Sequence, residues 1–170
     1  LMEDNPNIYL SMDETAENVA KKYQISRKEQ QEFAISSHQK AYAAQSNEKF
    51  DDEITPIISK NKKYDRDGGI RADTNQETLD GLKLAFDEKG TVTAGTSAPL
   101  TDGAAATLVC EEEYAKENNL EMFARIVSTA VQGCAPELMG LGPIDASNKA
   151  LKRAGISNND VDIVELNEAF

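Results

Sequence analysis

The spacing of apolar positions in the first half of the chain predicts helices. "TAENVAKKY", residues 15–23, repeats its apolar side chains at intervals of three and four, as one face of a short amphipathic helix does. A longer helix is expected from Ser26, where Glu29 follows three residues later and completes a capping box. Its apolar stripe extends the helix to about Gln45, through Phe33, Ala34, Ala41 and Ala44.

Between these helices and Gly90 the pattern is weaker. "DEITPIIS" predicts a short extended piece, and Pro56 keeps it away from the centre of a sheet because proline cannot donate to a strand ladder. "KNKKYDRDGGIR", residues 60–71, is expected to be a loop. A further helical stretch is expected near Glu77 to Phe86.

From Gly90 onward the pattern alternates and predicts strands separated by helices. The strand-like segments are "TVTAGTSAPLTDGAAATLVC", "MFARIVSTAV" and "VDIVEL". Helices are expected over 111–118 and in "GLGPIDASNKALKRAG", where Pro143 takes the first helical position and Gly155 ends the helix. The order strand–helix–strand–helix–strand places the second half in the α/β class, after a mainly helical first half.

Charge and composition narrow the kind of partner. The 170 residues carry a net charge of −12, which argues against nucleic acid, because phosphate contacts need a basic surface. The balance reverses locally in residues 60–71, which hold five basic and two acidic residues. Two interpretations stay open for this stretch: a solvated loop, or a site for a small phosphorylated ligand.

The same totals set an expectation for location and metal content. No apolar run approaches the roughly 20 residues that cross a bilayer, and no basic-then-apolar leader follows Leu1. Cys110 and Cys134 stand far apart, and the chain has a single histidine, so no structural zinc or other metal is expected. A reduced, cytoplasmic setting without a membrane span is the expectation.

Three side chains are candidates for nucleophilic or acid–base chemistry. Cys110 is followed by three glutamates, whose charge disfavours a thiolate, and Cys134 has no basic residue close in sequence. Both cysteines are therefore expected to be structural. His38 lies on the predicted second helix beside apolar residues, and a packed or hydrogen-bonded structural role is favoured for it.

Three long segments, in the same order along the chain, resemble the thiolase family. They are "TAENVAKKYQISRKEQQEFAISSHQKA", "GTVTAGTSAPLTDGAAATLV" and "MGLGPIDASNKALKRAGISNNDVDIVELNEAF". The similarity is greatest to the 3-ketoacyl-CoA thiolases of fatty-acid β-oxidation. It implies an α/β chain, a fragment of the layered αβαβα thiolase fold. Residues 1–98 would be a mainly helical loop domain that cradles coenzyme A, 99–122 the end of the N-terminal core half, and 123–170 the start of the C-terminal half.

The resemblance also implies a reaction. A thiolase transfers an acyl group between 3-ketoacyl-CoA and CoA through a nucleophilic cysteine. In the family this cysteine comes upstream of the position of Leu1, and a histidine and a second cysteine come downstream of the position of Phe170. The chain is therefore expected to be a central fragment and inactive alone. Its substrates would be acyl-CoA and CoA, with no permanently bound cofactor or metal, in a parent that forms a homodimer or homotetramer.

The resemblance makes eight residues candidates for function, seven of them at family positions and Ser97 beside a position where relatives often carry serine or threonine. Asn167 would be catalytic, its amide holding a water against the negative charge that develops on the thioester oxygen, in addition to acting as a helix N-cap. Arg71 falls near the nucleotide end of coenzyme A. The remaining candidates for binding CoA or the acyl group are Met12, Thr78, Phe86, Ser97, Met139 and Phe170.

Two departures from the family pattern affect these expectations. Ser11-Met12-Asp13 replaces a more usual His-Met-Gly or Met-Gly, and Ala98 replaces a common serine or threonine beside Ser97. Two other functions stay open: a non-catalytic CoA-binding or interaction fragment, and a biosynthetic acetoacetyl-CoA thiolase as the parent. The strands after Gly90 are expected to lack partners and to be marginal alone.

Overall fold

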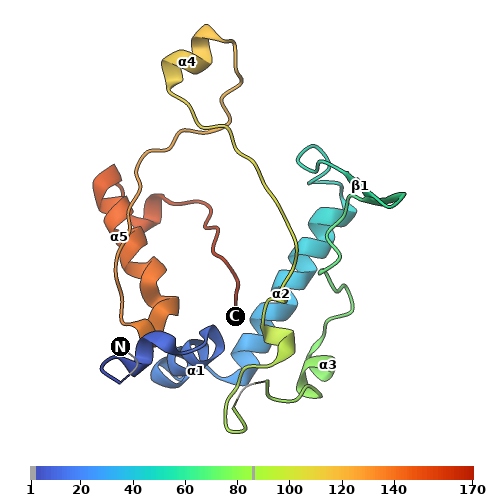
Figure 1. Ribbon diagram of the computed structural model, residues 1–170, viewed down its shortest axis with the longest axis vertical. Helices are drawn as coiled ribbons and strands as arrows, with labels where there is room; N and C mark the ends of the chain where they lie inside the picture. The colour runs from blue at the N-terminus through green and yellow to red at the C-terminus, as the bar shows by residue number, and fades with distance from the viewer. Residues whose placement is uncertain (1–2, 86) are drawn as a thin grey trace. The chain divides into compact units, whose positions relative to one another are not determined.

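The computed structural model describes residues 3–85 and 87–170 (Figure 1). Contacts divide the chain into two compact units. The first contains the described residues up to Pro99 together with Glu168–Phe170, and the second is Leu100–Asn167. Among the described residues, no helix is long and apolar enough to cross a lipid bilayer.

Two capped helices form the frame of the first unit, after a short 3₁₀ helix at Pro6–Tyr9. Helix α1 spans Met12–Tyr23 and helix α2 spans Arg27–Ser46, which confirms both predicted helices. The predicted capping box of α2 is present: the Glu29 carboxylate accepts hydrogen bonds of 2.7 Å from both the backbone N–H and the hydroxyl of Ser26. Ser11 and Glu14 form the same kind of box at the start of α1. Because each box satisfies N–H groups at the start of its helix, the starts of these helices are set locally.

A β-hairpin follows α2. Strands β1 (Ile57–Ser59) and β2 (Lys62–Tyr64) are antiparallel, with Ile57 opposite Tyr64. The two turn residues, Lys60 and Asn61, have φ of 47° and 64°, as a two-residue turn of the primed type requires. The prediction of a plain loop over residues 60–71 is thus wrong for β2. The lysines of β2 give no apolar alternation that would predict a strand. The hairpin instead depends on its turn and on backbone pairing.

Helix α3 is shorter than predicted. It spans only Gln76–Asp80, not 77–86, and Phe86 lies outside the described residues. The Nη2 atom of Arg27 donates hydrogen bonds to the carbonyls of Leu79, Asp80 and Leu82, at 2.9, 3.2 and 2.7 Å. A guanidinium 52 residues away therefore satisfies the last carbonyls of α3, and the helix ends there.

The core of the first unit gathers around residues 92–96. Val92 and Leu79 are buried, and the polar Thr93, Thr96 and Gln31 are buried with them. The segment is not the strand that its alternation predicts, since only an isolated bridge joins Leu84 to Thr93 before a 3₁₀ helix, η2, at Ala94–Thr96. Hydrogen bonds to side chains, rather than a strand ladder, hold this segment in position.

The second unit holds helices joined by irregular chain. Helix α4 is Glu112–Glu117, and α5 is Gly142–Ala154, flanked by 3₁₀ helices at Pro136–Leu141 and Asn158–Asp160. Both predicted α-helices are confirmed. Gly155 ends α5 in the left-handed conformation, with φ of 73°, as its sequence position predicts.

The rest of the strand-like segment 91–110 and the predicted strands over 122–131 and 161–166 form no ladder in the described chain. Their apolar side chains are left uncovered: Val131 is 85% exposed and Ile163 is 79% exposed. Side chains of α5 instead contact the second segment, where Arg153 donates to the carbonyl of Thr129 at 2.5 Å. A strand needs a partner for its backbone groups, and the described residues offer these three segments none. Residues 167–170, where Asn167 is the expected helix N-cap, are not helical.

Candidate functional site

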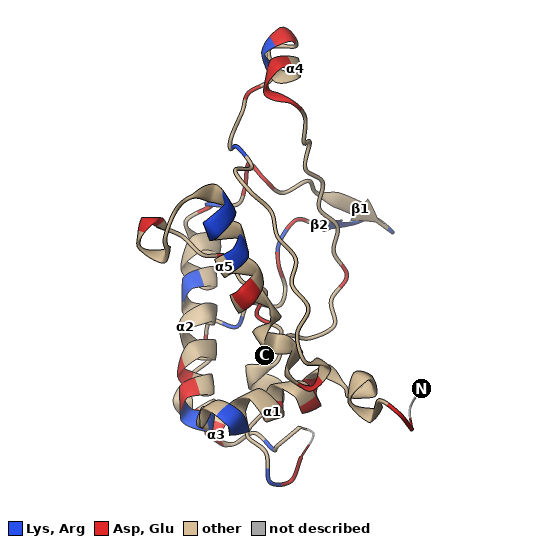
Figure 2. Cartoon of the chain, turned by 90° about the vertical axis from the view of Figure 1, so that its left-hand side faces the viewer, with Lys and Arg blue, Asp and Glu red and all other residues tan. Residues whose placement is uncertain are grey.

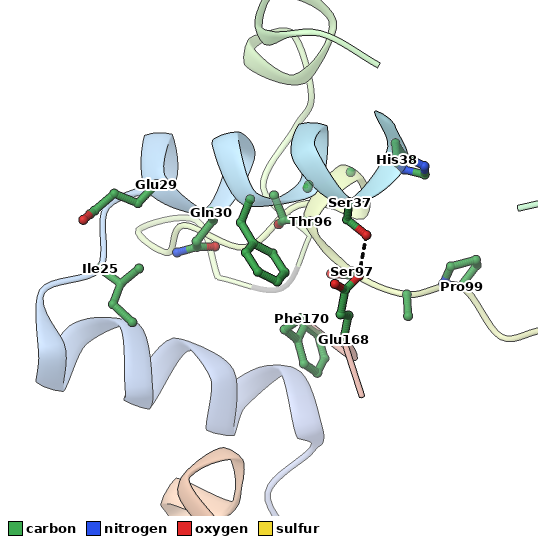
Figure 3. A pocket seen from close by; sticks show the side chains of 14 residues that line it. Ile25, Glu29, Gln30, Ser37, His38, Thr96, Ser97, Pro99, Glu168 and Phe170 are labelled. Atoms are coloured by element: carbon green, nitrogen blue, oxygen red, sulfur yellow. Dashed lines mark hydrogen bonds between the residues drawn. The ribbon is translucent and has the colours of Figure 1, made fainter. Parts of the chain in front are cut away.

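The first unit contains a cavity of about 490 Å³. Three segments form it: one face of α2 together with Ile25 just before that helix, the chain over 95–99, and part of Glu168–Phe170 (Figure 3). Its lining residues are Ile25, Glu29, Gln30, Phe33, Ala34, Ser37, His38, Gly95, Thr96, Ser97, Ala98, Pro99, Glu168 and Phe170. The surface combines apolar side chains with a few hydroxyl, amide and carboxylate groups, which is the usual composition of a small-molecule site.

One face of α2 provides the largest wall. The lining residues 30, 33, 34, 37 and 38 recur at intervals of three and four, so they share one side of the helix. Phe33 is 54% exposed even though it lies on the stripe that predicted a packed helix face. Sequence reasoning placed no ligand contact on this face. The same spacing that predicted the helix could have identified Gln30 and Ser37 as neighbours of the apolar stripe.

The second wall is a tightly bonded turn. The carbonyl of Thr93 accepts hydrogen bonds from the backbone N–H of Thr96 at 3.0 Å and from the hydroxyl of Ser97 at 2.8 Å. A β-carbon at Gly95 would lie 2.5 Å from Leu79 and 2.6 Å from Leu82, so this turn needs glycine for close packing. The predicted site residue Ser97 thus lines the cavity while its hydroxyl donates to the turn.

The third side joins the last residues of the chain to the other two walls. The hydroxyl of Ser37 donates to the Glu168 carboxylate at 2.5 Å (Figure 3). The backbone N–H of Ala98 donates to the carbonyl of Ala169 at 2.9 Å. These bonds hold Phe170, a predicted site residue, in the lining. Residues 131 positions apart in sequence therefore meet at one cavity.

Arg71 is tied to the edge of the cavity through its backbone. Its N–H donates to Nδ1 of His38 at 3.2 Å, while its side chain is exposed. His38 is half-buried and lines the cavity, and the hydrogen bond confirms the expected hydrogen-bonded state of this histidine. Since Nδ1 accepts, a neutral His38 carries its proton on Nε2. Arg71 does not itself line the cavity.

The basic stretch lies on the hairpin and the loop after it (Figure 2). Its cationic side chains are exposed, and the Nζ of Lys62 lies 4.9 Å from the ring centre of Tyr64. Lys63 pairs with Asp65 at 2.8 Å, and the hydrogen bond from Lys63 holds the pKa of Asp65 below its usual value. A local excess of exposed cations on an acidic chain favours an anionic group near this loop.

Thr78 and Met12 lie away from the cavity lining. The hydroxyl of Thr78 donates to the carbonyl of Asn75 at 2.9 Å and accepts from its N–H at 3.2 Å, which caps α3. Met12 is the first residue of α1 and is 46% exposed. Phe86 lies outside the described residues.

The second unit carries the remaining predicted residues. Met139 lies in the 3₁₀ helix before α5, and its carbonyl is 3.9 Å from Sγ of Cys134. Asn167 is exposed and is the last residue of this unit. Both cysteines are free and exposed, so neither has the packed position expected of a structural cysteine. Among the described residues, no group of histidine, cysteine and carboxylate side chains could hold a metal ion.

Two family profiles match the chain in succession. The family described as "Thiolase, N-terminal domain" matches residues 5–113, and "Thiolase, C-terminal domain" matches residues 120–170. The chain is 50% identical over 163 residues to the acetyl-CoA acetyltransferase of Paracoccus denitrificans, covering 94% of this chain and 42% of that protein. It is 51% identical over 162 residues to the 3-ketoacyl-CoA thiolase of Photobacterium profundum, covering 92% of this chain and 42% of that one.

Solved structures agree with the sequence relatives. Human mitochondrial 3-ketoacyl-CoA thiolase in complex with CoA is similar with a TM-score of 0.93 and 42% identity, over 98% of this chain and 42% of that one. The acetyl-CoA acetyltransferase of Bacillus anthracis gives a TM-score of 0.90 and 44% identity, over 95% and 42%. The chain thus spans about two fifths of the length of the relatives that it matches.

Proposed function

Because this chain belongs to the thiolase family and has part of its α/β fold, we propose that it is the central part of a 3-ketoacyl-CoA thiolase of the β-oxidation type. The observation that carries this proposal is the meeting of two segments at one cavity. Gly95–Pro99 belongs to the N-terminal domain match and Glu168–Phe170 to the C-terminal domain match. Both halves of the family therefore contribute to one candidate ligand site.

The cavity suits the arm and acyl group of a coenzyme A thioester. Phe33, Ala34 and Phe170 offer apolar surface, and the hydroxyls and amide along the walls can pair with the polar groups of the arm. The exposed side chain of Arg71, at the cavity edge, would pair with a phosphate of the nucleotide end. Met12, Thr78, Phe86 and Met139 remain proposed contacts on the family resemblance alone.

The chemical step would use a residue from this chain and others beyond it. Asn167 would hold a water against the oxygen on which negative charge develops, and such a fixed donor lowers a barrier by a few kcal/mol. A cysteine outside residues 1–170 would take the acyl group from 3-ketoacyl-CoA and release acetyl-CoA. A second CoA would then remove the acyl group as a shortened thioester. On this proposal the 170-residue chain is inactive alone.

The proposed organisation follows the same family logic. Residues 1–98 would be the loop domain, 99–122 the end of the first core half and 123–170 the start of the second. The whole protein would be a cytoplasmic homodimer or homotetramer without a permanent cofactor.

Thiolysis of a 3-ketoacyl-CoA by the 170-residue chain, with CoA in excess, tests the catalytic part of the proposal. We expect no turnover, because the nucleophilic cysteine and the family's histidine and second cysteine are not among these residues. Turnover that survives stringent purification and is lost in Cys110→Ser or Cys134→Ser would overturn the assignment of the nucleophile.

A biosynthetic acetoacetyl-CoA thiolase is the second candidate. It is favoured by the acetyl-CoA acetyltransferase of Paracoccus denitrificans, whose 50% identity nearly equals the 51% of the Photobacterium enzyme. Turnover of acetoacetyl-CoA and of a longer 3-ketoacyl-CoA by the complete protein separates the two. We expect the longer substrate to be cleaved faster, and equal or faster cleavage of the short one would count against the β-oxidation type.

A further inference from the structure

The carboxylate of Glu17 has an unusual set of partners for a residue in the middle of a helix. It accepts hydrogen bonds from the backbone N–H groups of Thr91 and Val92, each at 2.8 Å to Oε1, and from the Thr91 hydroxyl at 3.0 Å to Oε2. Helix α1 therefore contacts, through one half-buried side chain, a segment 74 residues later. The two N–H groups face the carboxylate as an anion-binding pair would.

The same threonine extends the contact to α2. The Nε2 of Gln30 donates to the Thr91 hydroxyl oxygen at 2.8 Å. Because that hydroxyl gives its only proton to Glu17, it can act toward Gln30 only as an acceptor, and the direction of every bond in the chain Gln30–Thr91–Glu17 is fixed. Gln30 itself lines the cavity.

Val92 leads directly into the bonded turn that forms the cavity wall. Val92 is 2% exposed and Thr93 is fully buried, so the start of the wall has little freedom once its N–H groups are held. Gly90, on the other side of Thr91, supports the same arrangement. A β-carbon there would overlap the Glu17 carboxylate, so only glycine leaves room for it.

We propose that Glu17 is a positioning residue of the candidate site, which acts through Thr91 to hold the wall over 93–98 and the Gln30 amide in their ligand-binding arrangement. It does not touch the cavity. The ligand class, a CoA thioester, rests on the proposed function, whereas the positioning of the wall does not depend on it.

The first test is amide hydrogen exchange over residues 91–97 in Glu17→Gln, with Glu14→Gln as the matched control. Glu14 lies on the same helix and also accepts hydrogen bonds, but only from Ser11 in its own capping box. Glutamine keeps one oxygen for the two N–H groups, but it loses the negative charge. Its NH₂ group would also face the Thr91 N–H, from which the second carboxylate oxygen of Glu17 accepts at 3.0 Å. Exchange at Thr91 and Val92 should therefore speed up by roughly tenfold or more, and exchange over 93–97 should rise with it. Unchanged exchange in Glu17→Gln would overturn the proposal.

The second test separates positioning from general stability. Thr91→Val removes the link to Gln30 but leaves both N–H bonds to Glu17, and Thr91→Ser keeps the hydroxyl. We expect Glu17→Gln and Gly90→Ala to weaken CoA binding roughly tenfold, about the weight of one charge-assisted hydrogen bond. Thr91→Val should weaken binding less, Thr91→Ser should restore it, and Glu14→Gln should leave it unchanged.

The two failures can be told apart. If the wild-type chain binds no CoA, the proposed function fails. The positioning role of Glu17 can still be tested by hydrogen exchange in Glu17→Gln, Thr91→Val and Thr91→Ser. If the wild type binds CoA and Thr91→Val equals Thr91→Ser in both affinity and exchange, the relay through Thr91 is wrong. Should Glu17→Gln fail to fold, the threonine pair alone carries the test.

Discussion

Gly95 shows how one missing side chain shapes the candidate site. The turn over 93–97 passes so close to Leu79 and Leu82 that an added methyl group would overlap both leucines. Leu79 is 4% exposed and cannot move outward without breaking the small core. Gly95→Ala should therefore lower the free energy of unfolding of the first unit by about 1–3 kcal/mol, measured by urea denaturation.

Gly81 provides the matched control. It ends α3 with φ of −70°, and a β-carbon there would meet no atom closer than 3.7 Å. Gly81→Ala should leave stability unchanged or raise it by up to about 1 kcal/mol, because alanine narrows the unfolded ensemble. Equal losses in the two variants would show that crowding by Leu79 and Leu82 is not the cause.

Gln31 is a residue whose polarity costs stability. It is 1% exposed, and its Nε2 has no hydrogen-bond partner in the described chain. The Oε1 of Gln31 accepts from Gln76 Nε2 at 2.6 Å, and the same Nε2 donates to Asp80 at 2.9 Å. Exchanging the oxygen and nitrogen of both amides would not help, because the Gln76 oxygen would then face the Asp80 carboxylate. Gln31→Leu should be neutral or stabilise the fold by about 1 kcal/mol in thermal unfolding. A loss as large as that of Gln31→Ala would contradict this account.

At the scale of elements, serine–carboxylate caps make helix starts sensitive to pH. The hydroxyl of Ser26, and then its backbone N–H, lower the pKa of Glu29 from 4.5. A carboxylate whose pKa is lower in the folded state than in the unfolded state stabilises the fold at pH values above its unfolded-state pKa. This stabilisation is lost as the pH falls through its folded-state pKa. The start of α2, followed by amide exchange, should therefore loosen as pH drops below about 4.5.

Ser26→Ala should reduce this pH dependence, since the hydroxyl is the larger cause of the lowered Glu29 pKa and the backbone N–H, which the variant keeps, is the smaller one. Ser36→Ala, within the same helix and away from its cap, should keep it. An identical pH profile in wild type and Ser26→Ala would show that the cap does not control the first turn.

Elements with local signals were predictable, and elements that depend on distant partners were not. The caps of α2 and the Pro143–Gly155 punctuation of α5 lie in short stretches of sequence, and both helices form as expected. The end of α3 depends on Arg27, which no local pattern near residue 80 reveals. The alternating segments after Gly90 have strand composition without strand partners, so periodicity alone predicted ladders that do not form in the described chain.

The candidate site divides in the same way. Ser97 and Phe170 came from family motifs and lie in the cavity, whereas Gln30, Ser37 and Glu168 line it and were not among the predicted residues. Their roles follow from contacts that bridge 61 and 131 residues, which sequence spacing within one helix cannot show.

At the scale of the whole molecule, uncovered apolar segments should govern behaviour in solution. Ile163 and Val164 are 79% and 76% exposed, in a stretch whose backbone is unpaired. Such segments associate with one another, so light scattering should show concentration-dependent assembly of the 170-residue chain. Ile163→Lys should reduce the assembly, and Asn159→Lys, which makes the same change in charge at a polar position, should not. Equal effects would point to net charge as the cause.

The central claim is that this chain carries a coenzyme A site of the thiolase family. Calorimetric titration of CoA into the 170-residue chain tests it most directly, with Arg71→Ala and the matched surface variant Arg66→Ala alongside. The account predicts one saturable site, weakened by roughly tenfold or more in Arg71→Ala and retained in Arg66→Ala. No saturable heat in the wild type, or the same loss in both arginine variants, would contradict it.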